Sequence, residues 1–329
     1  MKVDPGGIIF RDLAVEVALR LTDNEKARLG SVGWYTTTVK LELEVRGEIE
    51  REPRSNPQRL RLPSKAPLDE IALYNRERWN DLVDAGIVYS RPFLELTEAQ
   101  AWQELDPYGV LEEVKDKDTL VLAGGGGQQS AAFAFLGARV TVFDLSDKQL
   151  EKDALAAAHY NFPVRIERGD MRDLSRFADQ SFDIVYQPYS INFIPDPTLV
   201  FEGVKRILRT HGLYRVDFAN PFTMGLEEQE WNGKGYPLYG TYRDEEMHWD
   251  DNNWDVWHAD GTVLKIQGPR EFRHTLGHFV NSLIKQGFLI LGMWEELSGD
   301  PQAEPGTWEH YKAVAPPWLM VWSRLEEKV

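Results

Sequence analysis

The sequence of 329 residues contains no cysteine. This absence excludes disulfide bonds and thiolate metal sites, and with them the small secreted scaffolds that depend on either. No run of 18 apolar residues occurs, so no segment is typical of a transmembrane helix. The first residues, Met1–Gly7, also lack the charged stretch and apolar core of a signal peptide. We therefore expect a cytoplasmic protein that does not enter a membrane.

The sequence has fewer basic than acidic residues. Lysine and arginine together number 37 against 53 aspartates and glutamates, which gives a formal net charge of −16. Such a surface repels the phosphate backbone of DNA or RNA, so a nucleic-acid partner is disfavoured. Hydrophobic residues make up 42% of the chain, enough for a sizeable core. The length allows one large α/β domain with additions, or two modest domains.

The first part of the chain differs from the rest, and we expect an N-terminal accessory region over 1–66. Thr22 and Glu25 have the spacing of a capping box at the start of a short helix. Apolar and polar residues alternate over 33–50, which predicts a half-buried strand. Four prolines and many charges over 51–68 indicate a linker, in which we place the boundary to the next domain.

Residues 67–329 are expected to form one domain. Its first part, 67–115, has apolar residues at helical spacing and predicts a helical lid. Strands and helices then alternate, which is typical of a mostly parallel α/β sheet. An insertion, 222–270, follows the fifth strand, and a helix is predicted over 272–286. The expected strands lie at 120–123, 140–143, 164–166, 182–186, 212–218, 288–291 and 318–322.

A glycine loop, Gly124–Gly127, follows the first of these strands directly and precedes a predicted helix. Glycines let the backbone turn sharply and approach a ligand closely, so we expect Ala123, Gly124, Gly125, Gly127 and Gln129 to contact a nucleotide-like cofactor. A dinucleotide fingerprint needs Gly or Ala at the sixth position of the motif. Gln129 and Ser130 stand there, so an NAD-dependent oxidoreductase is disfavoured but stays an alternative.

Two carboxylates follow the next two strands. Asp144 ends the second strand, where a carboxylate can accept both ribose hydroxyls of an adenosine, and Leu145 follows it. Gly169, Asp170 and Met171 follow the third strand. Asp170 could accept the adenine amino group there, and Met171 could pack on the adenine ring. Without a role in cofactor binding, Asp144 would be a helix-capping or turn aspartate, and Gly169-Asp170 would be an ordinary turn.

These motifs, in this order and spacing, resemble those of class I S-adenosylmethionine (SAM)-dependent methyltransferases. The resemblance covers about residues 75–325, and the Gly-Gly-Gly-Gln-Gln loop is similar to that of an uncharacterised bacterial branch. It implies SAM as the cofactor and a Rossmann-like, seven-stranded, mostly parallel sheet whose last strand is antiparallel. It further implies that Gly125 and Gly127 line the methionine part of SAM. Gln187 to Ser190 would then form the floor beside the methyl group.

In the same resemblance, Arg91 or Tyr89 would reach the SAM carboxylate from the lid. Two residues depart from the family pattern. Val121 stands where an acid usually helps to bind the SAM amino group, and Ala123 stands where glycine is usual. These departures keep a second alternative open, a non-catalytic SAM-binding or scaffold protein.

Methyl transfer needs alignment more than a catalytic motif, and a general base only where the nucleophile is protonated. We name His274, at the start of the predicted helix, and Tyr189 as candidate catalytic residues. Tryptophans and acids in the insertion 222–270 favour a cationic or amphipathic small-molecule acceptor, unless the insertion only packs on itself. No recognised metal-ligand spacing occurs. We expect a monomer or a homodimer.

Overall fold

The chain divides into two compact units, Met1–Asp69 and Glu70–Val329, in the computed structural model. The predicted boundary at residue 66 lies close to this division. Among the described residues, no helix has both the length and the apolar character needed to cross a bilayer. The structure describes residues 8–45, 50–51, 59–61, 68–238, 240–249, 251–258, 260–300 and 302–327.

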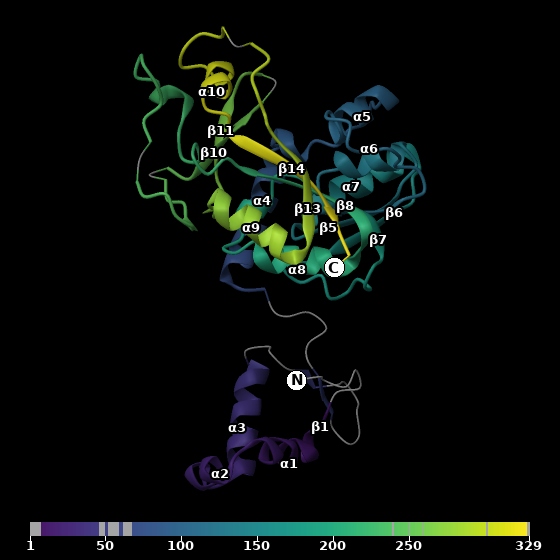
Figure 1. Cartoon of the computed structure of the whole chain (residues 1–329), viewed down its shortest axis with the longest axis vertical. Coiled ribbons are helices and arrows are strands. Elements are labelled where there is room, and N and C mark those ends of the chain that lie inside the picture. Colours follow the sequence, from purple (N-terminus) through teal and green to yellow (C-terminus); the bar gives the residue numbers. More distant parts are fainter. Residues whose placement is uncertain are drawn as a thin grey trace. The chain divides into compact units, whose positions relative to one another are not determined.

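The described part of the N-terminal unit consists of helices and short antiparallel strands (Figure 1). Thr22 caps the second helix, and its backbone in turn bonds the Glu25 side chain, so the predicted capping box is present. Most of the predicted linker over 51–68 lies outside the described residues. The elements are β1 Ile8–Ile9, α1 Phe10–Arg20, α2 Asp23–Leu29, α3 Val32–Val45, β2 Glu50–Arg51 and β3 Arg59–Arg61.

The strand predicted over 33–50 is wrong, because α3 occupies most of this segment. The alternation of residue types does not mark a buried face. Val39 and Leu41 are 52% and 49% exposed, whereas Lys40 between them is buried. The hydroxyl of Thr37 donates to a carbonyl oxygen one turn earlier, which satisfies it within the helix. Leucine, lysine and glutamate are also good helix formers, so local propensity overrides the alternation.

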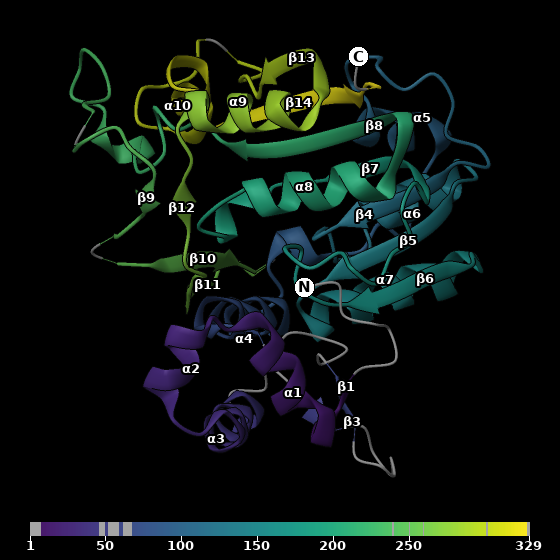
Figure 2. The same cartoon turned by 60° about the horizontal axis from the view of Figure 1, so that its bottom comes forward.

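A seven-stranded sheet with the order β13-β14-β8-β7-β4-β5-β6 forms the centre of the second unit (Figure 2). Strands β4 to β8 are mutually parallel, and β14 runs antiparallel to both of its neighbours. The predicted Rossmann-like fold with an antiparallel last strand is therefore confirmed. The strands are β4 Asp118–Leu122, β5 Arg139–Asp144, β6 Val164–Arg168, β7 Phe182–Gln187, β8 Leu208–Ala219, β13 Phe288–Glu295 and β14 Trp318–Leu325.

Helices cover both faces of this sheet, because side chains of a strand alternate between its faces. Leu120 of β4 belongs to a core with Phe201 of α8 and Phe279 of α9. Its neighbour Val121 belongs to a second core with Phe133 of α6. The helices are α4 Glu70–Asp84, η1 Val88–Ser90, α5 Glu98–Leu105, α6 Gln129–Phe135, α7 Asp147–Tyr160, η2 Ile191–Phe193, α8 Thr198–Ile207, α9 Leu276–Gln286 and α10 Trp308–Val314.

In the insertion after β8, β10 pairs with β11, and β9 pairs with β12, which follows the insertion; both pairs are antiparallel. Val256 of β10 packs with Leu82 of α4, so part of the insertion lies against α4. The predicted helix over 272–286 begins only at Leu276, because the residues before it pair with β9. The elements are η3 Glu228–Glu230, β9 Glu245–Glu246, β10 Asn253–Trp257, β11 Val263–Gln267 and β12 Phe272–Arg273.

Candidate functional site

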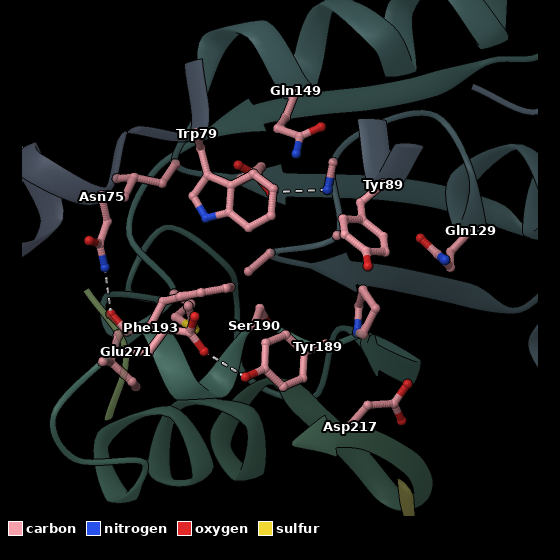
Figure 3. A pocket seen from close by; sticks show the side chains of 18 of the residues that line it. Asn75, Trp79, Tyr89, Gln129, Gln149, Tyr189, Ser190, Phe193, Asp217 and Glu271 are labelled. Atoms are coloured by element: carbon pink, nitrogen blue, oxygen red, sulfur yellow. Dashed lines mark hydrogen bonds between the residues drawn. The ribbon is translucent and has the colours of Figure 1, made fainter. Parts of the chain in front are cut away.

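A cavity of about 640 Å³ lies at the edge of the sheet where the parallel strands end (Figure 3). The loops after β4, β5, β6 and β7 line one part of it. Residues of α4, η1, α5, η2, β8, β10 and β14 are among those that line the rest. Most of the predicted site residues lie in its wall: Ala123, Gly124, Gly125, Gln129, Asp144, Leu145, Gly169, Asp170, Met171 and Tyr189.

The glycine loop approaches neighbouring chain too closely to carry side chains. A Cβ atom at Gly125 would lie 2.6 Å from Cβ of Gln149. One at Gly127, whose φ is +74°, would lie 2.6 Å from the carbonyl oxygen of Lys152. Ala123 has a φ of 48°, in the left-handed region that glycine adopts without strain. This conformation gives a physical reason why the resembled family usually has glycine at that position.

Asp153 of α7 anchors this loop through hydrogen bonds to its backbone amides. Its carboxylate accepts hydrogen bonds from the amides of Gly126 and Gly127, at 3.0 and 3.1 Å, and from the Ser130 hydroxyl. Burial raises the pKa of Asp153 to about 7 despite these three donors. Sequence reasoning missed Asp153, although an acid three residues after the buried Leu150, on the same helix face, was the available signal.

Asp144, the predicted ribose ligand, is 9% exposed at the end of β5. One carboxylate oxygen accepts from the amide of Gly125 at 3.0 Å and the other from the amide of Ser146 at 2.8 Å. Burial raises its pKa. The Ser146 hydroxyl caps α7 by accepting from the amide of Gln149. Gln149 lines the cavity, and its Oε1 is buried with no hydrogen-bond partner among the described residues. An unpartnered acceptor beside Asp144 suits a polar ligand.

The loop after β6 brings Gly169, Asp170 and Met171 to the cavity wall. A Cβ atom at Gly169 would lie 2.4 Å from the Phe143 ring, so the residue must be small for this loop to pack on β5. Asp170 forms an ion pair with Arg172, with 2.6 Å between nitrogen and oxygen. Both charged side chains therefore face this end of the cavity together.

Three of the predicted cofactor residues lie outside the cavity wall, namely Gly127, Gln187 and Arg91. Gly127 lies behind the loop on Asp153. Gln187 is fully buried, where it accepts from the Tyr214 hydroxyl at 2.6 Å and donates to the Ser190 hydroxyl at 3.1 Å. Its amide supports the floor of the cavity from beneath, because Ser190 itself lines the cavity.

Arg91 and His274 also point elsewhere. The Arg91 guanidinium donates to the carbonyl oxygens of Gly86 and Trp257, at 3.0 and 3.2 Å. Of the two residues expected to reach the SAM carboxylate, Tyr89 therefore lines the cavity and Arg91 does not. His274 is 1% exposed and lies 3.1 Å from the carbonyl oxygen of Ile191. Burial lowers its pKa. Neither side chain lies in the wall, because each is held by backbone carbonyls outside it.

Tyr189, the other candidate catalytic residue, does line the cavity and donates a 2.8 Å hydrogen bond to Oε2 of Glu271 (Figure 3). Glu271 immediately precedes β12 and is 7% exposed. Burial raises the pKa of Glu271 to about 7 and holds that of Tyr189 well above 10. Glu271 can therefore gain or lose a proton near neutral pH, whereas Tyr189 stays protonated and donates to it. Sequence reasoning missed Glu271, since nothing in its neighbourhood marks it.

Aromatic rings form the wall near this pair. Trp79 of α4 meets Phe193 and Trp254 edge to face, with ring centroids 5.3 and 5.5 Å apart. Tyr189 meets Phe193 at 5.6 Å, and Tyr89 meets Trp254 at 6.4 Å. All five residues line the cavity. The rings come from three separate parts of the chain, which is why periodicity alone could not group them.

The insertion reaches the cavity through Trp254. Its acids are used differently in the part that the structure describes. Glu245 lies 3.2 Å from Arg273, and Glu246 lies 2.6 Å from Arg270, so both are engaged in ion pairs away from the cavity. The insertion therefore contributes one aromatic residue, Trp254, to the cavity wall. The acid beside the rings is Glu271, which follows the insertion.

The opposite end of the cavity is polar. Gln129 donates to the carboxylate of Glu104 at 2.9 Å, and both residues line the cavity. Arg215 and Asp217 of β8 lie there as a paired unit, 2.9 Å apart. Within the described ranges, no group of three histidine, aspartate or glutamate side chains could hold a metal ion.

Comparison with known proteins agrees with this architecture. Residues 120–216 match a family described as a methyltransferase domain, and residues 1–60 match a family of unknown function. An uncharacterized methyltransferase of Bacillus subtilis (strain 168), YbaJ, is 27% identical over 247 residues, covering 70% of this chain and 93% of that protein.

Two solved structures share the fold. A putative SAM-dependent methyltransferase from Listeria monocytogenes has a TM-score of 0.52 at 19% identity, and one from Mesorhizobium loti has a TM-score of 0.50 at 24% identity. Each match covers 70% of this chain and 100% of the other. With the glycine loop at the strand edge, these findings show a methyltransferase fold in which residues 120–216 form the matched methyltransferase domain, and they support a SAM-dependent methyltransferase.

Proposed function

We propose that the protein transfers the methyl group of SAM to a small-molecule acceptor by in-line displacement, with both molecules in the cavity described above. The observation that carries this proposal is the continuity of that cavity. One wall holds the predicted cofactor residues at the strand ends, and the other holds the aromatic rings with Tyr189 and Glu271. A volume of about 640 Å³ falls within the range of sites that enclose small molecules.

The residues at the strand ends fit SAM. Asp144 would hold the ribose hydroxyls, because its oxygens have lone pairs left after accepting from two amides. The unpartnered Oε1 of Gln149 lies in the same wall. Asp170 would accept from the adenine amino group, and Met171 would pack on the ring. Here the Asp170–Arg172 pair adds a cation that the sequence reading did not assign.

Glu104 would hold the amino group of the methionine part. The resembled family usually has an acid at the position of Val121, and Val121 is fully buried in an apolar core here. Glu104 is a carboxylate in the cavity wall, and Gln129 orients it. The methionine part of SAM would lie close to the backbone of Gly124 and Gly125, since neither residue has a side chain.

Bound SAM supplies a methyl group on a positively charged sulfur, which leaves readily. The protein then has to align the acceptor and keep water out. The aromatic wall of Trp79, Phe193 and Trp254 performs the second task. Where the acceptor is protonated, the hydrogen-bonded pair of Tyr189 and Glu271 can accept the proton.

The glycine loop also bears on the NAD alternative. A dinucleotide-binding loop offers its amides to a pyrophosphate. In this chain the amides of Gly126 and Gly127 donate to Asp153, a carboxylate of the protein itself. That arrangement favours SAM, whose adenosine carries no phosphate, over NAD.

The test is calorimetric titration with SAM, S-adenosylhomocysteine and NAD, followed by methyl-labelled SAM with a library of small molecules. We expect micromolar binding of the first two ligands, no binding of NAD, and label transfer to an acceptor. SAM binding with no transfer to any acceptor would support a non-catalytic SAM-binding protein. Tight NAD binding would overturn the assignment of the cavity. A cytoplasmic location and a monomeric or homodimeric state stay predictions, checked by fractionation and light scattering.

A further inference from the structure

Glu271 is a buried carboxylate that has no counter-ion among the residues the structure describes. Its side chain lies in the cavity wall at 7% exposure, and its hydrogen-bond partner is the Tyr189 hydroxyl at 2.8 Å. No lysine, arginine or histidine of the described ranges lies within ion-pair distance of it. The neighbouring Arg270 turns away to Glu246, at 2.6 Å. Burying a carboxylate in this way is costly unless something compensates its charge.

Most other acids of the cavity differ from Glu271 in this respect. Glu104 and Glu296 are less buried, and Glu296 lies 3.9 Å from Lys312. Asp170 has Arg172 at 2.6 Å and Asp217 has Arg215 at 2.9 Å. Asp144 is compensated differently, by two backbone amides. Only one of the two oxygens of Glu271 is engaged by Tyr189, so Oε1 stays available to a ligand. The cavity therefore offers one strongly buried carboxyl group that no cation of the described residues neutralises.

The aromatic wall beside Glu271 suits a positive charge. Phe193 packs edge to face on both Tyr189 and Trp79. The rings therefore form a continuous row from Tyr189, which bonds Glu271, to α4, which carries Trp79. Asn75 ties this wall to the residue before Glu271, because its amide donates to the carbonyl oxygens of Phe193 and Arg270, at 3.0 and 3.1 Å (Figure 3). Ring faces attract cations, and desolvation in a buried site strengthens the attraction.

We propose that the methyl acceptor carries an alkylammonium group, and that Glu271 binds this group within the wall formed by Tyr189, Phe193, Trp79 and Trp254. This inference rests on the proposed function, since it names the acceptor class for the same cavity. The hydroxyl of Tyr189 holds one carboxylate oxygen, and the ammonium contacts the other. The ring faces enclose the alkyl part and the remaining surface of the cation.

The test uses a pair of ligands of one shape and different charge, choline and 3,3-dimethylbutan-1-ol. Calorimetry is performed on the full chain saturated with S-adenosylhomocysteine. We expect choline to bind at least tenfold more tightly than the neutral alcohol. Glu271→Gln should abolish this preference, because the amide keeps the size and the acceptor for Tyr189 but not the charge. Glu202→Gln, an exposed position on α8 outside the cavity, should retain it.

Equal affinity of the two ligands for the unaltered protein would overturn the inference, and this outcome does not depend on any variant folding. A choline preference that survives in Glu271→Gln would overturn the role of Glu271. Failure of S-adenosylhomocysteine to bind would instead overturn the proposed function. In that case the choline comparison can still be made on the protein alone, so the two failures are distinguishable.

Discussion

The carboxylate of Asp153 lies under the glycine loop, with Oδ2 3.0 Å from the amide nitrogen of Gly126. This contact joins α7 to the loop after β4, so the shape of the cofactor site depends on a residue that is itself outside the cavity wall. The loop is therefore held in shape by the protein before any ligand enters, which lowers the cost of ordering it on binding.

Replacing Asp153 should damage both stability and cofactor affinity. In Asp153→Asn the side-chain NH₂ would face a backbone N–H, which leaves donors without an acceptor. We expect a loss of about 2–4 kcal/mol in the free energy of unfolding, measured by urea denaturation, and at least tenfold weaker SAM binding. Asp147→Asn in the first turn of the same helix, where the side chain is exposed, is the control and should change stability by less than about 1 kcal/mol. Unchanged stability in Asp153→Asn would refute the anchoring role.

The two ends of the cofactor can be tested separately with matched ligands. S-adenosylhomocysteine contains the amino-acid part, whereas 5′-methylthioadenosine lacks it. Glu104→Gln should weaken S-adenosylhomocysteine binding by about 10–100-fold, the size of a charge-assisted hydrogen bond, and leave 5′-methylthioadenosine unaffected. Equal effects on both ligands would show that Glu104 acts on the shape of the site rather than on the amino group.

Asp144→Asn should behave differently in the same calorimetric titrations. Both ligands contain the ribose, so both should bind at least tenfold more weakly when one of the two carboxylate acceptors becomes a donor. Thermal denaturation without ligand serves as the control, because Asp144 also accepts from Gly125 and Ser146. A variant that keeps its affinity for 5′-methylthioadenosine would remove Asp144 from the ribose site.

The sequence was most informative where a pattern is local and repeated. The alternation of strands and helices predicted the sheet, and the glycine loop with Asp144 and Asp170 predicted the part of the cavity wall formed by consecutive strand ends. Those residues are found together because parallel strands all end at one edge. α3 was misread because an alternating pattern can also occur on a helix whose apolar residues are exposed.

The rest of the site depends on contacts between distant segments, which no local pattern encodes. Glu271 meets Tyr189 across more than eighty positions in sequence, and Trp254 meets Trp79 across an even longer separation. Arg91 and His274 were plausible by residue type. The structure turns both toward backbone carbonyls instead, which is a matter of side-chain direction and not of position in the chain.

Trp254 offers a test of the contribution of the insertion. Trp254→Ala should weaken choline binding at least tenfold, because the ring lines the cavity beside Trp79 and Tyr89. Binding of S-adenosylhomocysteine should be unaffected. Trp257→Ala is the matched control on the same strand, since that ring is 65% exposed and lies outside the cavity wall. If the two variants bind choline equally well, the insertion plays no part in the acceptor site.

Glu271 should make the stability of the protein depend on pH. Burial raises its pKa from the ordinary 4.5 to about 7. A carboxyl whose pKa is raised on folding binds its proton more tightly in the folded state. Its favourable contribution is therefore complete below pH 4.5 and is lost as the pH rises through 7. The difference of between two and three pKa units corresponds to about 3 kcal/mol, most of which develops between pH 5 and pH 8.

Glu271→Gln removes this buried charge, so the variant should be more stable than the unaltered protein at pH 8, by up to about 3 kcal/mol, and nearly equal to it at pH 5. Urea unfolding at the two pH values measures the difference, with Glu202→Gln as the control that should show none. Adding choline at pH 8 should stabilise the unaltered protein and not Glu271→Gln, because a bound cation compensates the charge that folding buries. A variant that is less stable at both pH values would mean that Glu271 serves packing and hydrogen bonding alone.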